Sequence, residues 1–153
     1  MGKCCCFAGH SKLYDSAIID RVVAVARMLI TEHSVTEFLV GNYGSFDAYA
    51  AAAVRRLKKE YPQITLSFVI PYLTQEINEY RDDYYKKYDS IIVATIPEST
   101  PRNLKIIKTN EYMVNESDYI ICYVNTPWGG SAKTMEYAQR KNIKVINLGS
   151  LTL

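Results

Sequence analysis

The fold is decided by the stretch Ile120-Ile121-Cys122-Tyr123-Val124-Asn125-Thr126-Pro127-Trp128-Gly129-Gly130-Ser131-Ala132-Lys133-Thr134-Met135-Glu136. It begins as a short apolar run rich in β-branched and aromatic residues, which predicts a buried strand. Pro127 ends that strand because proline donates no hydrogen bond to a ladder. Two glycines and a helix-forming run to Lys141 follow. This order of strand, glycine turn and helix directs free backbone N–H groups and the positive end of a helix dipole towards an anion.

Polar side chains crowd this turn and favour a bound phosphate over an empty loop. Ser131 and Thr134 offer hydroxyl donors beside the glycines, and Asn125 precedes them. A βα turn without a ligand is the alternative. Residues 132–134 resemble the end of a Walker A loop, but glycine is missing at positions 127 and 132, where that motif requires it. We therefore do not predict a P-loop ATPase.

Apolar runs alternate with helical patterns along the chain. The predicted strands are residues 4–8, 37–40, 64–70, 90–96, 118–124 and 143–148. The predicted helices are residues 15–33, 46–61, 104–115 and 130–141, with a further helix over the tyrosine-rich residues 76–87. In the helix at 104–115, the spacing predicts that Leu104, Ile106, Ile107 and Met113 face inward.

This alternation is typical of parallel βαβ units with helices on both faces of the sheet. We expect an α/β fold, a Rossmann-like three-layer sandwich with a mostly parallel sheet of about six strands. Residues 1–153 are expected to form a single domain.

Composition narrows the classes of function. Charges of both signs are spread along the chain, with a net charge of +2, so the sequence argues against nucleic acid as a partner. The four cysteines, Cys4, Cys5, Cys6 and Cys122, fit neither a disulfide framework nor a zinc site and are expected as free core thiols. We therefore expect a cytoplasmic protein without metal or cofactor. No apolar run is long enough to span a bilayer.

The loops that follow the predicted strands are the candidate site, because α/β sheets bind ligands outside the carboxyl ends of their strands. Three of the five loops contain glycine and meet at one edge in a doubly wound sheet. The candidate ligand-binding residues are Gly9, His10, Ser11, Gly41, Asn42, Tyr43, Gly44, Asp47, Pro71, Tyr72, Asn125, Trp128, Gly129, Gly130, Ser131 and Thr134.

Three segments together resemble the YpsA-type branch of the SLOG superfamily, which includes the Smf/DprA and LOG proteins. They are residues 4–10, residues 41–47 and residues 125–131. The resemblance covers nearly the whole chain. It implies a Rossmann-like fold whose pocket binds nucleotides or nucleotide-derived molecules, in many cases as sensors in bacterial and phage conflict.

The resemblance also extends to LOG phosphoribohydrolases, which cleave a base from a nucleoside monophosphate. Gly129, Gly130 and Glu136 match glycines and the glutamate of the LOG motif P-G-G-x-G-T-x-x-E. Trp128 replaces its proline, and the arginine that LOG enzymes carry in the preceding helix is absent from residues 104–115. Glu136 is therefore a catalytic candidate only for an enzyme of this kind.

Several candidates have a plain structural alternative. His10 either contacts a phosphate or acts as acid or base, or it is a loop imidazole bonded to backbone. Tyr43 either packs on a base or ribose or belongs to the core, and Asp47 either binds ribose hydroxyls or complements a helix dipole. Glu136 either stabilises positive charge on ribose or pairs with Arg140 on the surface.

These observations lead to two main hypotheses of function and a third, weaker one, a protein-interaction or DNA-associated module as the resemblance to DprA implies, against which the absence of a basic patch argues. The first is an intracellular binding protein, a sensor or sponge for a nucleotide-like ligand whose phosphate lies at Gly129-Gly130. The second is a LOG-like nucleotide N-glycosidase, so the sequence leaves open whether the protein is an enzyme. Tyr72 and Tyr80 either close the pocket or form a dimer surface, and we expect a homo-oligomer.

Overall fold

The computed structural model describes residues 2–152. Its elements are β1 (Lys3–Gly9), α1 (Ala17–His33), β2 (Val35–Val40), α2 (Ser45–Glu60), β3 (Thr65–Ile70), α3 (Gln75–Glu79), α4 (Arg81–Lys87), β4 (Ser90–Val93), the 3₁₀ helix η1 (Arg102–Leu104), α5 (Lys105–Asn115), β5 (Tyr119–Tyr123), α6 (Gly130–Arg140) and β6 (Lys144–Asn147).

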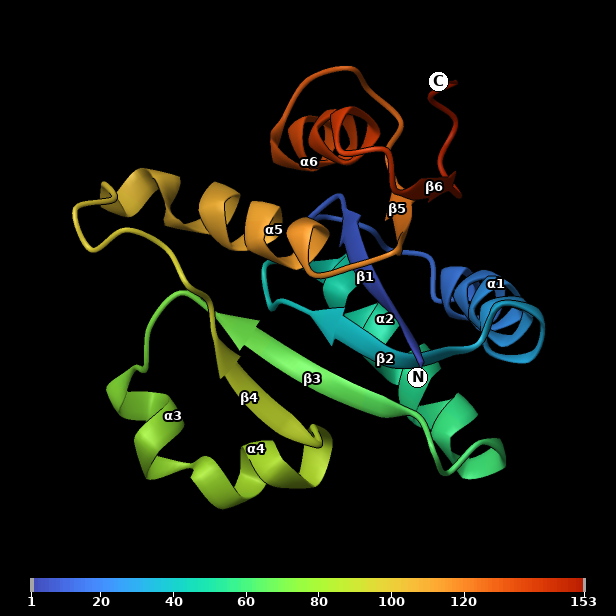
Figure 1. Ribbon diagram of the computed structural model, residues 1–153, viewed down its shortest axis with the longest axis horizontal. Helices are drawn as coiled ribbons and strands as arrows, with labels where there is room; N and C mark the ends of the chain where they lie inside the picture. Colours follow the sequence, from blue (N-terminus) through green and yellow to red (C-terminus); the bar gives the residue numbers. More distant parts are fainter. Residues whose placement is uncertain (1, 153) are drawn as a thin grey trace.

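The strands form one parallel sheet in the order β4-β3-β2-β1-β5-β6 (Figure 1). In the centre, Cys6 of β1 pairs with Leu39 of β2 and with Ile120 of β5. The chain builds outward from β1 to β4 on one side and then returns to add β5 and β6 on the other. The order therefore reverses between β1 and β5, which is the switch point where open α/β sheets bind ligands.

Both faces of the sheet are covered. Alternate side chains of β1 point to opposite faces: Cys5 and Phe7 pack with α1 and α2, whereas Cys4, Cys6 and Ala8 pack with α5 and α6. Because both faces are buried, the strand is apolar throughout instead of alternating with polar residues. The predicted α/β three-layer sandwich with six strands is confirmed, and every strand pair is parallel.

The tyrosine-rich segment differs from its prediction because it forms two short helices. The helices α3 and α4 meet at Tyr80 and lie beside the outer strands of the sheet (Figure 1). The ring of Phe68 on β3 stacks with Tyr84 at 5.7 Å and with Tyr88 at 4.7 Å between centroids. Part of the tyrosine content of this segment is therefore explained by packing against β3.

The end of β4 and the buried face of the helix predicted over residues 104–115 differ from their predictions for physical reasons. Strand β4 ends at Val93 because Val93 pairs with Ile70, the last residue of β3. In the helix predicted over residues 104–115, Met113 is buried as expected, but Ile106 of α5 is 46% exposed and Leu104, which lies in η1, is 38% exposed. The buried residues of α5 are Thr109, Met113 and Val114, so its first turn has no core to face.

Within residues 2–152, the structure contains no helix of the length and apolarity that a bilayer crossing requires.

Candidate functional site

A cavity of about 380 Å³ lies at the carboxyl ends of β1 and β5. Its size falls within the range of small-molecule sites, roughly 300–1,000 Å³. It is lined by Ala8, Gly9, His10, Ser11, Tyr43, Asp47, Ile106, Asn110, Thr126, Trp128, Gly129, Gly130 and Ser131. The loops after β1, β2 and β5, far apart in the sequence, thus converge on one hollow at the switch point of the sheet.

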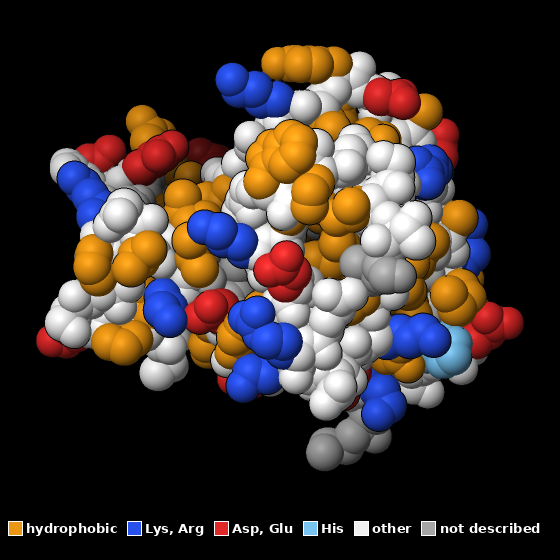
Figure 2. Space-filling model, turned by 90° about the horizontal axis from the view of Figure 1, so that it is seen from above, with side chains coloured by type: hydrophobic (Ala, Val, Ile, Leu, Met, Phe, Trp, Pro, Cys, Tyr) orange, Lys and Arg blue, Asp and Glu red, His pale blue; other side chains and the backbone are white. Residues whose placement is uncertain are grey.

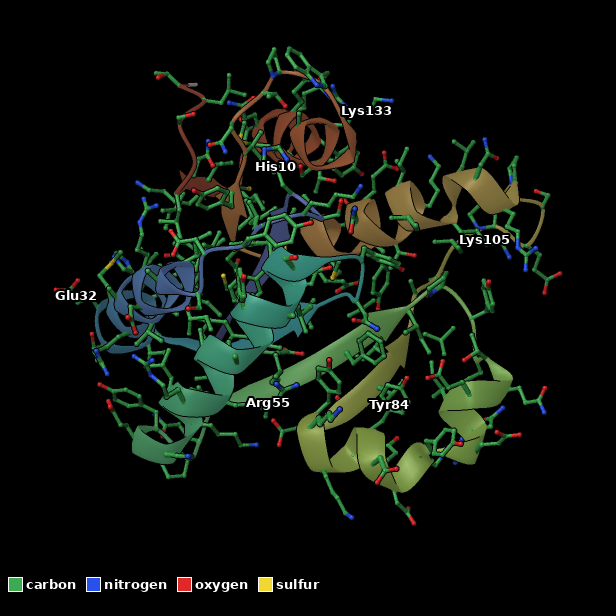
Figure 3. All side chains as sticks on the ribbon, turned by 180° about the vertical axis from the view of Figure 1, so that it is seen from behind. His10, Glu32, Arg55, Tyr84, Lys105 and Lys133 are labelled. Atoms are coloured by element: carbon green, nitrogen blue, oxygen red, sulfur yellow. The ribbon has the colours of Figure 1, made fainter. Side chains whose placement is uncertain are left out.

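His10 ties the end of β1 to the loop after β5. Its Nε2 accepts a hydrogen bond from the backbone N–H of Asn125 at 2.8 Å, and its Nδ1 lies 3.3 Å from the hydroxyl of Ser131. Because Nε2 is an acceptor, the neutral ring carries its hydrogen on Nδ1 and donates it to Ser131. The hydroxyl hydrogen of Ser131 is then free to donate into the cavity. Figure 3 shows His10 next to α6.

The first turn of α6 forms the second wall. Gly129 adopts φ 97° immediately before the helix, and a Cβ built on either Gly129 or Gly130 would meet no atom within 4 Å. Among residues 2–152, the backbone N–H groups of Gly130, Ser131 and Ala132 have no acceptor. These free donors and the helix dipole face open space, which is the arrangement that receives an anion.

The start of α2 is built differently, because protein atoms already occupy it. The carbonyl of Ser11 accepts hydrogen bonds from the backbone N–H of Ser45 at 2.9 Å and from the Ser45 hydroxyl at 3.0 Å. A Cβ on Gly44 would lie 2.3 Å from the Cα of Ser11. Gly44 is thus needed for close packing of two loops, and α6 offers the more open helix end.

Asp47 supplies a buried carboxylate to the third wall. It is 9% exposed, and its Oδ2 accepts a hydrogen bond from the backbone N–H of Tyr43 at 2.9 Å. Burial raises the pKa of Asp47 to about 6, and the bond from Tyr43 opposes this increase only in part. No salt bridge within residues 2–152 involves this carboxylate.

Tyr43 separates the cavity from a smaller hollow of about 220 Å³. Its hydroxyl is buried without a hydrogen-bond partner among the described residues, and burial raises its pKa. The smaller hollow holds three other candidates, Asn42, Pro71 and Tyr72. The ammonium group of Lys105 lies 4.5 Å from the ring centroid of Tyr72.

The structure therefore divides the sixteen ligand-binding candidates. Nine of them line the main cavity: Gly9, His10, Ser11, Tyr43, Asp47, Trp128, Gly129, Gly130 and Ser131. Trp128 stands at its rim with 71% of its surface exposed.

Three further candidates line the smaller hollow, and the last four lie outside both hollows. The side chain of Asn125 accepts from the backbone N–H and hydroxyl of Ser150. The hydroxyl of Thr134 donates to the carbonyl of Gly130 at 3.0 Å. Gly41 and Gly44 do not line either hollow.

Glu136 lies on the exposed side of α6 and does not line the cavity. The alternative contact proposed for it, an ion pair with Arg140, is also absent among residues 2–152. The carboxylate that does line the cavity belongs to Asp47.

Ile106 and Asn110 line the cavity but were not expected there. Both lie in α5, and attention to the loops after strands could not find them. The periodicity of the helix assigned Ile106 to the core, and Asn110 carries no motif.

The chain matches a family model named YpsA, described as the YspA SLOG family, over residues 11–148. Among curated proteins, it is 28% identical to a UPF0398 protein of Halalkalibacterium halodurans over 123 residues, which are 74% of this chain and 64% of that protein. It is 26% identical over 136 residues to an uncharacterised SPbeta prophage-derived protein, YoqJ, of Bacillus subtilis, covering 79% of this chain and 80% of that protein.

Among solved structures, the fold is similar to that of DNA processing protein A (DprA) of Streptococcus pneumoniae. The TM-score is 0.69 at 16% identity, and the match covers 99% of this chain and 52% of that one. The present chain thus spans slightly less than two thirds of the Halalkalibacterium protein and about half of DprA.

Proposed function

The chain belongs to the YspA SLOG family, and from this premise we propose that it binds a nucleotide or nucleotide-derived molecule in the cavity between β1 and β5. The phosphate lies at the first turn of α6, against the free N–H groups of Gly130 and Ser131. The sugar or base extends towards Tyr43 and Asp47. The observation that carries this proposal is the pairing of an open helix N-terminus with a buried carboxylate across one cavity.

The two walls differ in the groups they accept. The α6 wall offers hydrogen-bond donors and no carboxylate, so it suits an anion. The Asp47 carboxylate suits a hydroxyl or amine donor, as ribose and the bases carry. Trp128 at the rim offers an exposed ring for stacking on a base. A phosphorylated ligand with hydrogen-bond donors at its other end satisfies both walls.

Gly130→Asp tests the phosphate position, with Gly130→Asn as its matched control. Aspartate places a negative charge where the phosphate lies, whereas asparagine has almost the same shape and no charge. The Cβ that both variants add meets no atom within 4 Å, and a carboxylate in the first turn of a helix favours the fold.

We expect Gly130→Asp to abolish binding of nucleoside phosphates in a thermal-shift and calorimetric screen without lowering the melting temperature of the free protein. Gly130→Asn should retain most of the affinity, and equal affinities for both variants would refute this phosphate site.

A LOG-like nucleotide N-glycosidase is the second candidate function. It is favoured by the cavity carboxylate of Asp47, since burial raises the pKa of this group to about 6 and so into the range of a general acid or base at neutral pH. Base release from nucleoside monophosphates, followed by chromatography, tests it. An enzyme that uses Asp47 loses turnover in Asp47→Asn, while Glu136→Ala retains it; loss in Glu136→Ala alone would restore the LOG-type role of Glu136. A wild-type protein that releases no base from any of these nucleotides is not such an enzyme.

Further parts of the proposal concern the role and setting of the protein. We propose a cytoplasmic sensor or sponge that assembles as a homo-oligomer and acts in conflict between bacteria and phage. The buried free thiols support a reducing compartment, and the prophage origin of one relative supports the link to phage. The expectation against nucleic acid has no support from the comparisons, because a structural neighbour is a DNA processing protein.

A further inference from the structure

Five basic side chains surround a hollow of about 310 Å³ at the other end of α2. Arg55, Lys58 and Lys59 come from the last turns of α2, and Lys86 and Lys87 come from the end of α4. Tyr85, Tyr88 and Leu66 complete the apolar part of this hollow, and Asp89 is its single carboxylate. We call this set of nine residues the basic hollow.

The basic hollow is separate from the cavity between β1 and β5. Asp47 in the first turn of α2 lines the cavity, and Lys59 near the end of the same helix lines the basic hollow. At 1.5 Å per residue, these two positions are about 18 Å apart along the helix axis. The two sites therefore lie at opposite edges of the sheet and share no lining residue.

The single carboxylate of the hollow is already engaged. Asp89 forms an ion pair with Lys58, and its Oδ2 accepts a hydrogen bond from the backbone N–H of Leu66 at 2.7 Å. Burial acts to raise the pKa of Asp89, but these contacts outweigh burial and lower it, so the group stays ionised. Asp89 consequently neutralises Lys58 and leaves the other cations available.

Arg55 fixes the geometry between the two helices. Its Nε donates to the carbonyl of Lys87 at 2.9 Å, and its guanidinium lies 5.1 Å from the ring centroid of Tyr88. This contact occupies the carbonyl at the end of α4 and holds the lysines of both helices around one hollow. Figure 3 shows Arg55 on α2 and Tyr84 on α4.

Three ammonium groups face solvent with little or no ion pairing. Lys59 and Lys87 form no salt bridge within residues 2–152, and Lys86 has only a 3.9 Å contact with Asp83, where both side chains are largely exposed. Cations at helix C-termini also complement the dipole, which accounts for lysines on each helix separately. The dipole does not account for the exposed aromatic ring that lines the hollow together with these lysines.

That ring belongs to Tyr85. It is 48% exposed, and among the described residues it takes part in no aromatic pair or cation–π contact, unlike Tyr84 and Tyr88. An unengaged ring among cations is the combination that holds single strands, where phosphates meet lysine or arginine and a base stacks on the aromatic face.

We propose that the basic hollow binds single-stranded nucleic acid, with Lys59, Lys86 and Lys87 on successive phosphates and Tyr85 stacked on a base. An acidic protein surface matches the cations as well, but a single strand also supplies regularly spaced phosphates with a base between them for Tyr85. A duplex keeps its bases stacked inside and leaves none for Tyr85. The ligand class is therefore an unpaired strand.

The test is fluorescence anisotropy of a short labelled oligothymidylate with the full chain. Lys59→Glu with Lys87→Glu should weaken binding at least about tenfold, because two phosphate contacts become repulsions. The matched control is Lys141→Glu with Lys144→Glu, which makes the same change of charge on exposed lysines beside β6, at the far side of the sheet. This control should lose far less affinity. Equal losses would show a general effect of net charge and overturn the proposal.

Two further measurements distinguish the contribution of phosphate contacts from that of base stacking. With three phosphates bound, the logarithm of the binding constant should fall with the logarithm of salt concentration with a slope of about −2. Tyr85→Ala should weaken binding about tenfold and leave that slope unchanged. Stronger binding of a duplex than of the single strand, or binding only to vesicles that contain phosphatidylserine, would overturn the proposal.

The proposal is independent of the nucleotide cavity. Gly130→Asp should leave oligothymidylate binding at the basic hollow unchanged, and the Lys59 and Lys87 variant should leave nucleoside phosphate binding unchanged. Loss of oligothymidylate binding in Gly130→Asp, with none in the lysine variant, would place the strand in the cavity and refute the basic hollow.

Discussion

Burial of the Asp47 carboxylate lowers the stability of the folded protein. Its pKa is 3.8 in the unfolded chain and about 6 in the folded protein because burial disfavours the charged carboxylate. Below about pH 3 the group is protonated in both states and carries no cost. As pH rises towards 6 the unfolded chain releases the proton first, so stability falls, and above 6 the full cost remains, at most about 3 kcal/mol. A costly carboxylate facing a cavity is typical of a binding or catalytic group.

Asp47→Asn is expected to stabilise the protein in a pH-dependent manner. The amide oxygen can still accept from the N–H of Tyr43, but it carries no charge to desolvate. We expect a gain of about 1–3 kcal/mol at neutral pH, or roughly 2–10 °C in melting temperature, and almost no gain at about pH 3. Thermal melts at the two pH values measure this, with Asp82→Asn on the exposed face of α4 as control. An equal gain at both pH values would contradict a desolvated carboxylate.

Among the residues that line the cavity, Gly129, Gly130 and His10 could be predicted from the sequence because each belongs to a turn with a specific requirement. Gly129 has φ 97°, and the loop after β1 allows His10 to reach the backbone of the loop after β5 at Asn125. Ile106 and Asn110 could not be identified, because their place in the cavity depends on the angle at which α5 crosses the sheet. That angle is set by packing between helices and leaves no local pattern.

At the scale of elements, two helix N-termini that look alike in sequence have different roles. Both α2 and α6 begin after a glycine, yet the first N–H of α2 is bonded to Ser11, whereas the first N–H groups of α6 face open space. Sequence alone cannot tell them apart, because the difference depends on where the loop after β1 lies.

Alanine at the two glycines should show this difference as opposite changes in stability. Gly44→Ala places a methyl group 2.3 Å from the Cα of Ser11, and such overpacking costs about 1–3 kcal/mol. Gly130→Ala meets no atom and should be neutral or stabilising by up to about 1 kcal/mol, because alanine is the better helix former. Denaturant titration measures both. A similar loss at both positions would show that the start of α6 is not open.

At the scale of the whole molecule, the sheet and its layers followed from the sequence, whereas the surface did not. Unbroken apolar runs such as residues 4–8 predicted strands buried on both faces, and β1 fulfils that prediction at the centre of the sheet. The charges appeared evenly mixed along the chain, and they are mixed on the face seen in Figure 2. Folding nevertheless brings residues 55–59 and 85–89 together into the basic hollow, a contact between segments about thirty positions apart that no linear pattern reveals.

The central claim is that the cavity between β1 and β5 holds a phosphate-bearing ligand at the start of α6. Its most direct test is mass spectrometry of the small molecules released when the purified protein is denatured, with Gly130→Asp and Gly130→Asn prepared in the same way. We predict a near-stoichiometric nucleotide or nucleotide-derived species that carries phosphate in the wild type and in Gly130→Asn, and its loss in Gly130→Asp. A released species without phosphate, or full occupancy retained in Gly130→Asp, would contradict the account.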